Sequence, residues 1–279
     1  MRNFLTIIGL CFIGQIGFAQ CDTSEFKESY KNGSYVKGWL VCEKKSGEWN
    51  YYDKDNKLIK KVNYLEGQLN GERSIWYPNG QEKSLEFWVG GKLNGTAKYW
   101  NEDGTLVQES EYENGELQGT SREWFDNGKQ KSLTTYIDGK KSGEYEMYYE
   151  NGNLKEKGKF LEGELDGDIK HYFENGNISS EIFYDKGVHN GKYSTFHEDG
   201  SMSVQGEYEA GNQIGLWKMF HVNGQLVSQG YYNAGSKDGE WEEWFMTGKP
   251  KSKGIYSNGE KIEIWTEWDE SGKKTKTKY

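Results

Sequence analysis

Arginine is scarce in this 279-residue sequence, which carries a formal net charge of −9. After the first 19 residues, only Arg73 and Arg122 remain. Nucleic-acid recognition uses basic clusters and bidentate guanidinium contacts, and anionic membranes attract polybasic segments. We therefore expect no nucleic-acid partner and no strong binding to anionic membranes.

Motifs of catalysis are missing as well. The sequence has no glycine-rich phosphate loop and no His-Glu-x-x-His or Gly-x-Ser-x-Gly string, the signatures of nucleotide, zinc-protease and serine-hydrolase sites. The 44 acidic residues are expected to lie on solvated strand faces and turns. The sequence predicts a protein that is not an enzyme and needs no cofactor.

Histidine is rare, with four residues. His197 and His221 stand 24 residues apart at equivalent positions of a repeat, which would separate them by about 9.6 Å, two strand spacings of a sheet. A zinc ion needs each ligand nitrogen within about 2.1 Å. His171 and His189 occupy other positions of the repeat, and we expect no metal site.

Aliphatic residues are few, and a mean hydropathy of −0.98 with 28% charged residues would by itself favour disorder. Aromatic residues argue against that, because they make up 15% of the chain and each ring can bury about 150–250 Å². Only Pro78 and Pro250 are prolines, and most glycines are periodic. We therefore predict one folded, patterned domain.

A 24-residue unit, typified by residues 143–166, recurs without insertion or deletion from Gly47 to Gly272. The opening glycines are Gly47, Gly71, Gly95, Gly119, Gly143, Gly167, Gly191, Gly215 and Gly239, with Glu263 in the tenth position. Five residues after each stands a first ring: Tyr52, Trp76, Trp100, Trp124, Tyr148, Tyr172, Phe196, Phe220, Trp244 and Trp268. Twelve residues further stands a second ring: Tyr64, Trp88, Tyr112, Tyr136, Phe160, Tyr184, Tyr208, Tyr232 and Tyr256. Such a period indicates a repeat array, here nine full units and a partial one over residues 47–279.

Each unit predicts a β-hairpin, because two aromatic-rich runs flank Asn-Gly or Asp-Gly. In the first unit Asn56 replaces the glycine, which fits a backbone position with positive φ. The predicted fold is all-β, an elongated single-layer antiparallel sheet of stacked 24-residue hairpins.

The loop length decides which rings share a face. A three-residue loop, Glu150-Asn151-Gly152 with Gly152 as a bulge, would place Tyr148, Leu154 and Phe160 on one face. We prefer this loop because it gives one continuous aromatic ladder.

These units resemble the bacterial variant of the MORN repeat, the type found in YwqK-family antitoxins. The resemblance is carried by glycines, rings and spacing in strings such as GTSREWFDNGKQKSLTTYIDGKKS, and covers residues 47–272. It implies a string of hairpins in one elongated sheet. It also implies scaffolding, membrane apposition or partner binding, and it transfers no catalytic residue.

Residues 1–19 predict a secretion signal, because Arg2 precedes an apolar run that ends in Gly17-Phe18-Ala19. A transmembrane anchor is an alternative. Cys21 leaves open a lipid anchor, although Gln20 precedes it where a lipobox has a small residue. We expect an exported protein, either periplasmic, envelope-associated or secreted.

Removal of the signal would leave Cys21 and Cys42 as the only cysteines. In an oxidising compartment they are expected to pair, with two free thiols as the alternative. Residues 20–46 depart from the period and predict a capping segment, since repeat sheets need atypical ends to protect their open edges. Residues 273–279, KKTKTKY, predict a charged edge strand.

The face opposite the predicted ladder carries further aromatic residues. The candidates for a binding face are Trp49, Tyr145, Tyr149, Trp217, Trp241 and Phe245. They either form a second, minor core or an exposed strip that binds a partner.

The sequence is compatible with three functions. The first is an exported, non-catalytic scaffold that binds a protein partner or an envelope component. The second is a carbohydrate- or cell-wall-binding array, because the aromatic hairpins also resemble choline-binding modules. The third is an antitoxin-like immunity protein that binds a toxin, which the family resemblance alone suggests.

Overall fold

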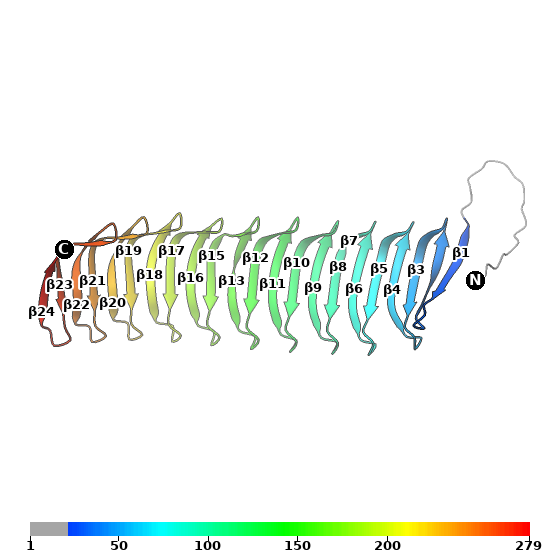
Figure 1. The fold of residues 1–279 in the computed structure, drawn as a ribbon, viewed down its shortest axis with the longest axis horizontal. Helices are drawn as coiled ribbons and strands as arrows, with labels where there is room; N and C mark the ends of the chain where they lie inside the picture. The colour runs from blue at the N-terminus through cyan, green and yellow to red at the C-terminus, as the bar shows by residue number, and fades with distance from the viewer. Residues whose placement is uncertain (1–21) are drawn as a thin grey trace, which may run out of the picture.

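The computed structural model describes residues 22–279, which form one open antiparallel sheet of 24 strands with no helix in that part of the chain (Figure 1). Nearly every strand pairs with the strands that precede and follow it in the sequence. The predicted all-β, single-layer array of hairpins is confirmed. The first 21 residues, including the predicted signal and Cys21, lie outside the described residues.

The strands are short and regular. In chain order they are β1 Thr23–Ser29, β2 Tyr35–Val41, β3 Lys44–Tyr52, β4 Leu58–Leu65, β5 Gln68–Trp76, β6 Glu82–Val89, β7 Lys92–Leu93, β8 Gly95–Trp100, β9 Leu106–Glu113, β10 Glu116–Trp124, β11 Gln130–Ile137 and β12 Lys140–Tyr148. They continue with β13 Leu154–Leu161, β14 Glu164–Leu165, β15 Gly167–Tyr172, β16 Ile178–Asp185, β17 Val188–Phe196, β18 Met202–Glu209, β19 Asn212–Phe220, β20 Leu226–Asn233, β21 Ser236–Trp244, β22 Pro250–Ser257, β23 Glu260–Trp268 and β24 Lys274–Lys278.

The turns of the central unit are those that its glycines require. Tyr149 N donates to Asn153 O at 2.9 Å around the loop of residues 150–152, and Gly152 has φ +94°, as the predicted three-residue loop demands. Asn56 has φ +63°, which confirms the positive φ predicted for this position. At the other end of the unit Glu162 and Gly163 both have positive φ, 52° and 96°, the type I′ geometry of a two-residue hairpin turn.

A second irregularity corrects the predicted faces. Tyr148 pairs with Leu154, whereas Met147 pairs with Glu156, so Lys155 is an extra residue in the ladder. A β-bulge of this kind reverses the alternation that the loop alone would set. Phe160 therefore shares its face with Tyr145, with ring centroids 4.5 Å apart, and the prediction that it shares a face with Tyr148 is wrong.

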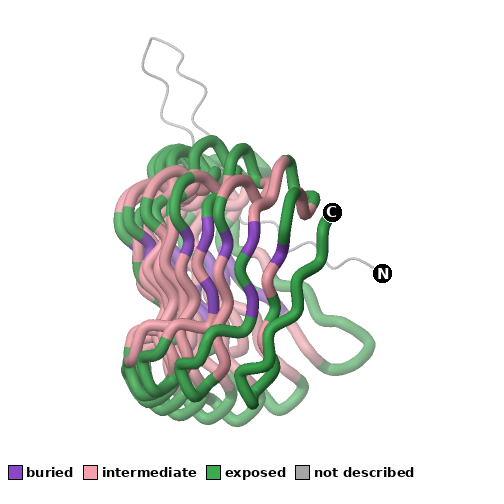
Figure 2. The backbone as a smooth tube through the Cα atoms, turned by 90° about the vertical axis from the view of Figure 1, so that its left-hand side faces the viewer, coloured by how far each residue is buried: buried purple, intermediate pink, exposed green. Residues whose placement is uncertain are grey.

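The core is a single central row of side chains that crosses all strands except the two-residue β7 and β14. It contains nearly all of the deeply buried apolar residues, among them Trp49, Val62, Ala97, Tyr145, Ile169, Trp217, Trp241 and Trp265, each at most 3% exposed. Along the sheet the row reads Phe26, Gly38, Trp49, Val62, Arg73, Glu86, Ala97, Ser110, Ser121, Thr134, Tyr145, Gly158, Ile169, Ile182, Tyr193, Gly206, Trp217, Gly230, Trp241, Gly254, Trp265 and Thr277. Figure 2 shows buried segments in the middle of the strands and exposed turns at both edges.

Tryptophan lies against glycine wherever the row carries an indole. A Cβ on Gly206 would lie 2.2 Å from the Trp217 ring, and one on Gly254 would lie 2.2 Å from Trp265. Large and small residues thus alternate across neighbouring strands, which is how a single sheet layer can pack an indole flat on its own backbone.

The two faces of the sheet differ. We call the face that carries the central row and the second rings the ring face, and the opposite one the charge face. On the charge face, cross-strand partners pair their charges, as in Lys98–Glu109 at 3.0 Å and Lys170–Glu181 at 2.5 Å. Such surface pairs contribute little stability each, at most about 1 kcal/mol.

The predicted capping segment forms a further hairpin, β1–β2, that continues the sheet. Phe26 packs against Trp49 with ring centroids 5.2 Å apart. Cys42 is disulfide-bonded and lies in the turn between β2 and β3 with φ +52°. Since Cys21 lies outside the described residues, the predicted Cys21–Cys42 pairing stays a prediction.

Replacement of Gly206 by alanine should destabilise the array by about 1–3 kcal/mol, because the added methyl group overpacks the Trp217 ring. Urea unfolding measures the change. Gly163→Asn is the control, since a Cβ added to Gly163 would have no neighbour within 4 Å and asparagine tolerates positive φ. An equal loss in both variants would contradict the packing role of the central glycines.

Candidate binding face

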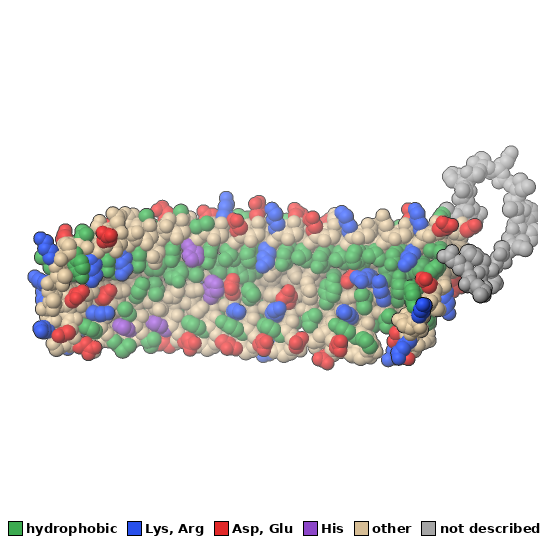
Figure 3. All heavy atoms as spheres, viewed as in Figure 1, with side chains coloured by type: hydrophobic (Ala, Val, Ile, Leu, Met, Phe, Trp, Pro, Cys, Tyr) green, Lys and Arg blue, Asp and Glu red, His purple; other side chains and the backbone are tan. Residues whose placement is uncertain are grey.

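The ring face presents a continuous band of hydrophobic side chains along the whole array (Figure 3). Tyr232, Trp241 and Tyr256 follow one another edge to face, with centroids 5.2 and 6.0 Å apart. Lysines cover the outer side of this band, and Lys237 Nζ lies 4.0 Å from the Trp241 centroid. Burial lowers the pKa of Lys237.

Four of the predicted binding-face aromatics are core residues. Trp49, Tyr145, Trp217 and Trp241 are 1–3% exposed, so they offer no surface to a partner. The bulge places them on the same face as the second rings, which cover them. The alternative that they form a core therefore describes them, and they are in fact the principal core.

The other two predicted residues, Tyr149 and Phe245, are half-buried and directly precede the loops of residues 150–152 and 246–248. Tyr149 OH donates to Tyr172 O of the next unit at 2.8 Å. Tyr77 and Trp100 make the same contact at 2.9 Å. The Tyr77 and Tyr149 hydroxyl groups thus link one unit to the next. The half-buried tyrosine rings keep part of their surface exposed.

Between β5 and β11 the central row loses its rings. Its residues there are Arg73, Glu86, Ala97, Ser110, Ser121 and Thr134. Ser110 Oγ lies 2.7 Å from Ser121 Oγ, and Ala97 and Ser110 are fully buried. The floor of the ring face is therefore small and polar in this part of the array.

Glu86 is the most buried carboxylate in this polar stretch, with its side chain 6% exposed. Arg73 Nη1 contacts its Oε2 at 2.5 Å, and Trp88 Nε1 donates to the same oxygen at 3.0 Å. Burial first, and then the Glu86 charge, raise the pKa of Tyr99 to about 12. Ser84 Oγ is buried beside this cluster without a hydrogen-bond partner among the described residues.

A second polar cluster crosses β12, β13, β15 and β16. Tyr145 OH donates to Glu156 Oε1 at 2.5 Å, His171 Nε2 lies 3.7 Å from Glu156 Oε2, and Ser180 Oγ lies 2.8 Å from His171 Nδ1. Burial, and then the bond to Glu156, raise the pKa of Tyr145 well above its usual range, so the phenol remains a donor. In a serine-hydrolase triad the histidine Nε2 contacts the serine and Nδ1 contacts the carboxylate. Here the two are exchanged, because His171 Nδ1 contacts Ser180 and Nε2 faces Glu156.

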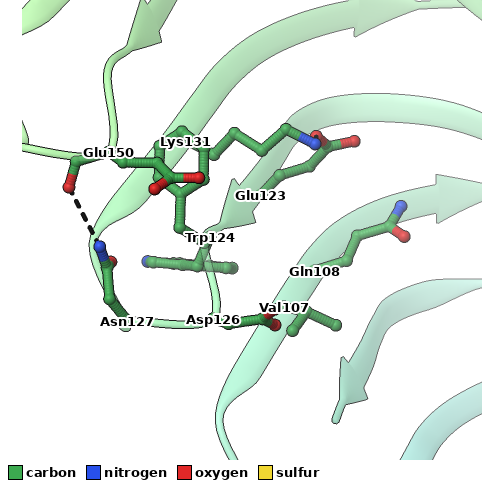
Figure 4. Close-up of a pocket in the computed structure, with 9 residues that line it drawn as sticks. Val107, Gln108, Glu123, Trp124, Asp126, Asn127, Lys131 and Glu150 are labelled. Atoms are coloured by element: carbon green, nitrogen blue, oxygen red, sulfur yellow. Dashed lines mark hydrogen bonds and ion pairs between the residues drawn. The ribbon is translucent and has the colours of Figure 1, made fainter.

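The largest hollow described on the array has a volume of about 720 Å³ and lies on the ring face near the Asn-Gly loops (Figure 4). It is lined by Val107, Gln108, Glu123, Trp124, Phe125, Asp126, Asn127, Lys131 and Glu150. Lys131 Nζ lies 3.1 Å from Glu123 Oε2, and Asn127 Nδ2 donates to Glu150 O at 3.0 Å. One of the six predicted binding-face aromatics, Phe245, lines a described hollow.

Within residues 22–279 no group of three or more His, Cys, Asp or Glu side chains is placed to hold a metal ion. The same residues include no helix long and apolar enough to cross a membrane.

Comparison with known proteins identifies the repeats. A family model described as MORN repeat variant matches residues 45–66, 93–114, 141–162, 165–186, 213–234 and 237–258. The chain is a MORN-repeat protein. The units that open at Gly71, Gly119 and Gly191 lie between the matched segments, and two of them carry Arg73 and Ser121 of the polar stretch.

No curated protein matches the MORN array. Among solved structures, one chain of a structure titled "Crystal Structure of TcdB2-TccC3-Cdc42" is 10% identical over 86% of this chain, with a TM-score of 0.14. The array spans 18% of that chain's length. A similarity at this TM-score says nothing about shared fold or function.

Replacement of Arg73 by methionine should cost about 3 kcal/mol, because it leaves the buried Glu86 carboxylate without its cation. A second change, Glu86→Leu, should recover most of that loss. Urea unfolding of the single and double variants measures both. A double variant no more stable than Arg73→Met would show that the unpaired Glu86 carboxylate is not the cause of the lost stability.

The array should lose stability in alkali. A phenol whose pKa rises from 10 in the unfolded chain to about 12 in the folded one, as for Tyr99, contributes stability that is complete below pH 10. That contribution disappears as the pH rises through about 12. Circular dichroism with a tyrosinate absorbance titration follows this loss, and Tyr99→Phe should reduce it. Ionisation of Tyr99 near pH 10 with no effect on folding would contradict the buried environment.

Proposed function

We propose that this MORN array is an exported, non-catalytic scaffold that binds a protein or an envelope component on its ring face. The observation that carries the proposal is the size of one hollow on the ring face. The charge face pairs some of its charges across strands, as in Lys98–Glu109, and its described hollows are smaller, at about 340 to 380 Å³. The ring face keeps half-buried aromatic residues and a hollow of about 720 Å³.

Rigidity between units supports a scaffold. Asn127 Nδ2 donates to Glu150 O, Asn151 Nδ2 to Glu174 O and Asn175 Nδ2 to Glu198 O, at 3.0 to 3.1 Å. These bonds tie each of these three loops to the next along one edge of the sheet. The ring face is thereby a long, regular platform on which contacts at separate units keep fixed spacing.

Export rests on the signal predicted over residues 1–19, outside the described residues. The resemblance to YwqK-family antitoxins suggests one form of the same function, in which the protein partner is a toxin exported with the array. In that case too the binding surface would be the ring face.

Site-specific photocrosslinking tests this proposal. A benzophenone amino acid at Met147 on the ring face is compared with one at Leu216 on the charge face, residues of nearly equal exposure at 37% and 39%. In envelope and secreted fractions of the source cell, position 147 should give discrete adducts and position 216 should not. Adducts from position 216 alone would contradict a ring-face scaffold.

A further inference from the structure

We propose that two hollows on the ring face, which share three lining positions in the units that open at Gly119 and Gly239, bind one uncharged polysaccharide chain. The inference rests on the proposed function in one respect, that the ring face is the binding face.

The two units share a sequence that the other units lack. Residues 123–132 read EWFDNGKQKS and residues 243–252 read EWFMTGKPKS, identical at seven of ten positions. No other unit that opens between Gly47 and Gly239 combines glutamate four residues after its opening glycine with lysine eight residues later. The common string is thus more specific than the period itself.

The structure places the shared residues around a hollow in both units. Glu123, Phe125 and Lys131 line the first, of about 720 Å³, and the equivalent Glu243, Phe245 and Lys251 line the second, of about 300 Å³. The glutamate and lysine form an ion pair in each, at 3.1 and 3.7 Å. An indole completes each lining, Trp124 in the first and Trp268 in the second.

The lining selects a class of ligand. In the first hollow Glu123, Asp126 and Glu150 outnumber Lys131, and in the second Glu243 and Glu267 balance Lys251 and Lys261. Neither hollow has the excess of positive charge that an anionic ligand needs. Carboxylate, amide and ammonium groups around half-buried rings instead supply acceptors and donors for hydroxyl groups and a flat apolar surface for a sugar ring.

An extended peptide fits these hollows poorly. Recognition of a peptide as an added strand requires an unpaired sheet edge, and the strands beneath the first hollow, β9, β10 and β11, are paired on both sides. A ligand at this place must be held by side chains alone, as a sugar chain is.

The spacing favours a polymer. The hollows are five units apart, which at two strands per unit and about 4.8 Å per strand is about 48 Å. A long chain that occupies both gains from a high effective concentration at the second site, whereas a short oligosaccharide occupies one hollow at a time.

Affinity electrophoresis in gels that contain hydroxyethyl cellulose, laminarin, galactomannan, arabinoxylan or dextran tests the proposal, with polygalacturonate as an anionic comparison. The variants are E123A/K131A, E243A/K251A and the combined quadruple variant. The matched control is E240A/K253A, which removes a Lys–Glu ion pair from the charge face. Thermal unfolding by circular dichroism confirms that all four variants fold.

At least one neutral polymer, and not polygalacturonate, should retard the protein. Loss of either hollow should weaken binding of that polymer by about tenfold or more, loss of both by about a hundredfold or more, and the control variant should bind as the native protein does. Binding of the corresponding tetrasaccharide should fall by only about twofold when one hollow is lost, since half of its sites remain.

Absence of retardation by every neutral polymer, or equal weakening in the control variant, would overturn the inference. Ring-face crosslinking to a protein from position 147 without polymer binding would overturn it while the scaffold proposal survives. Polymer binding that depends on the hollows, with protein adducts from position 216 alone, would uphold it and remove the protein-scaffold proposal.

Discussion

One extra residue in each hairpin determines how this sheet packs. In all nine hairpins from β3–β4 to β21–β22 the register shifts by one residue just before the first ring, as between Met147 and Tyr148. The shift sends the second ring, Phe160 in that unit, to the side of Tyr145. Because the bulge recurs at the same place, the central row and the second rings lie on one face along the whole array, and a single sheet acquires a core without a second layer.

That core varies in chemistry along its length while the backbone stays constant. From Gly206 to Trp265 it alternates indole with glycine, and from Arg73 to Thr134 it is polar except at Ala97. Strands pair only with their neighbours, so a change in one unit needs compensation only in the adjacent ones. The same repeat can therefore carry different central-row residues on one binding face. The large hollow lies next to the polar part of the row, at Gln108 and Glu123.

The sequence predicts the hairpins well because their turns have strong local requirements. Gly152 and Asn56 are where positive φ is needed, and both have it. The bulge at Lys155 has no such mark, since its backbone accepts an ordinary residue. Without it the sequence predicts Phe160 on the face of Tyr148 and leaves open whether Trp217 lies in a core or on a binding surface. The size complementarity of Gly206 and Trp217, eleven residues apart, is the signal that could have located the core. The hollows are visible in sequence only as the repeated EWF string, and their shape depends on the bulge.

Hydroxyl-radical footprinting of the whole chain, read residue by residue by mass spectrometry, tests most directly whether the bulge places the central row inside. Trp49, Trp217, Trp241 and Trp265 should be protected, at 1–3% exposure, while Trp39, Tyr231 and Met246, at 50–66%, should be modified readily. Modification of Trp217 and Trp241 as fast as Tyr231 would mean that these indoles face solvent and that the bulge does not place the central row inside.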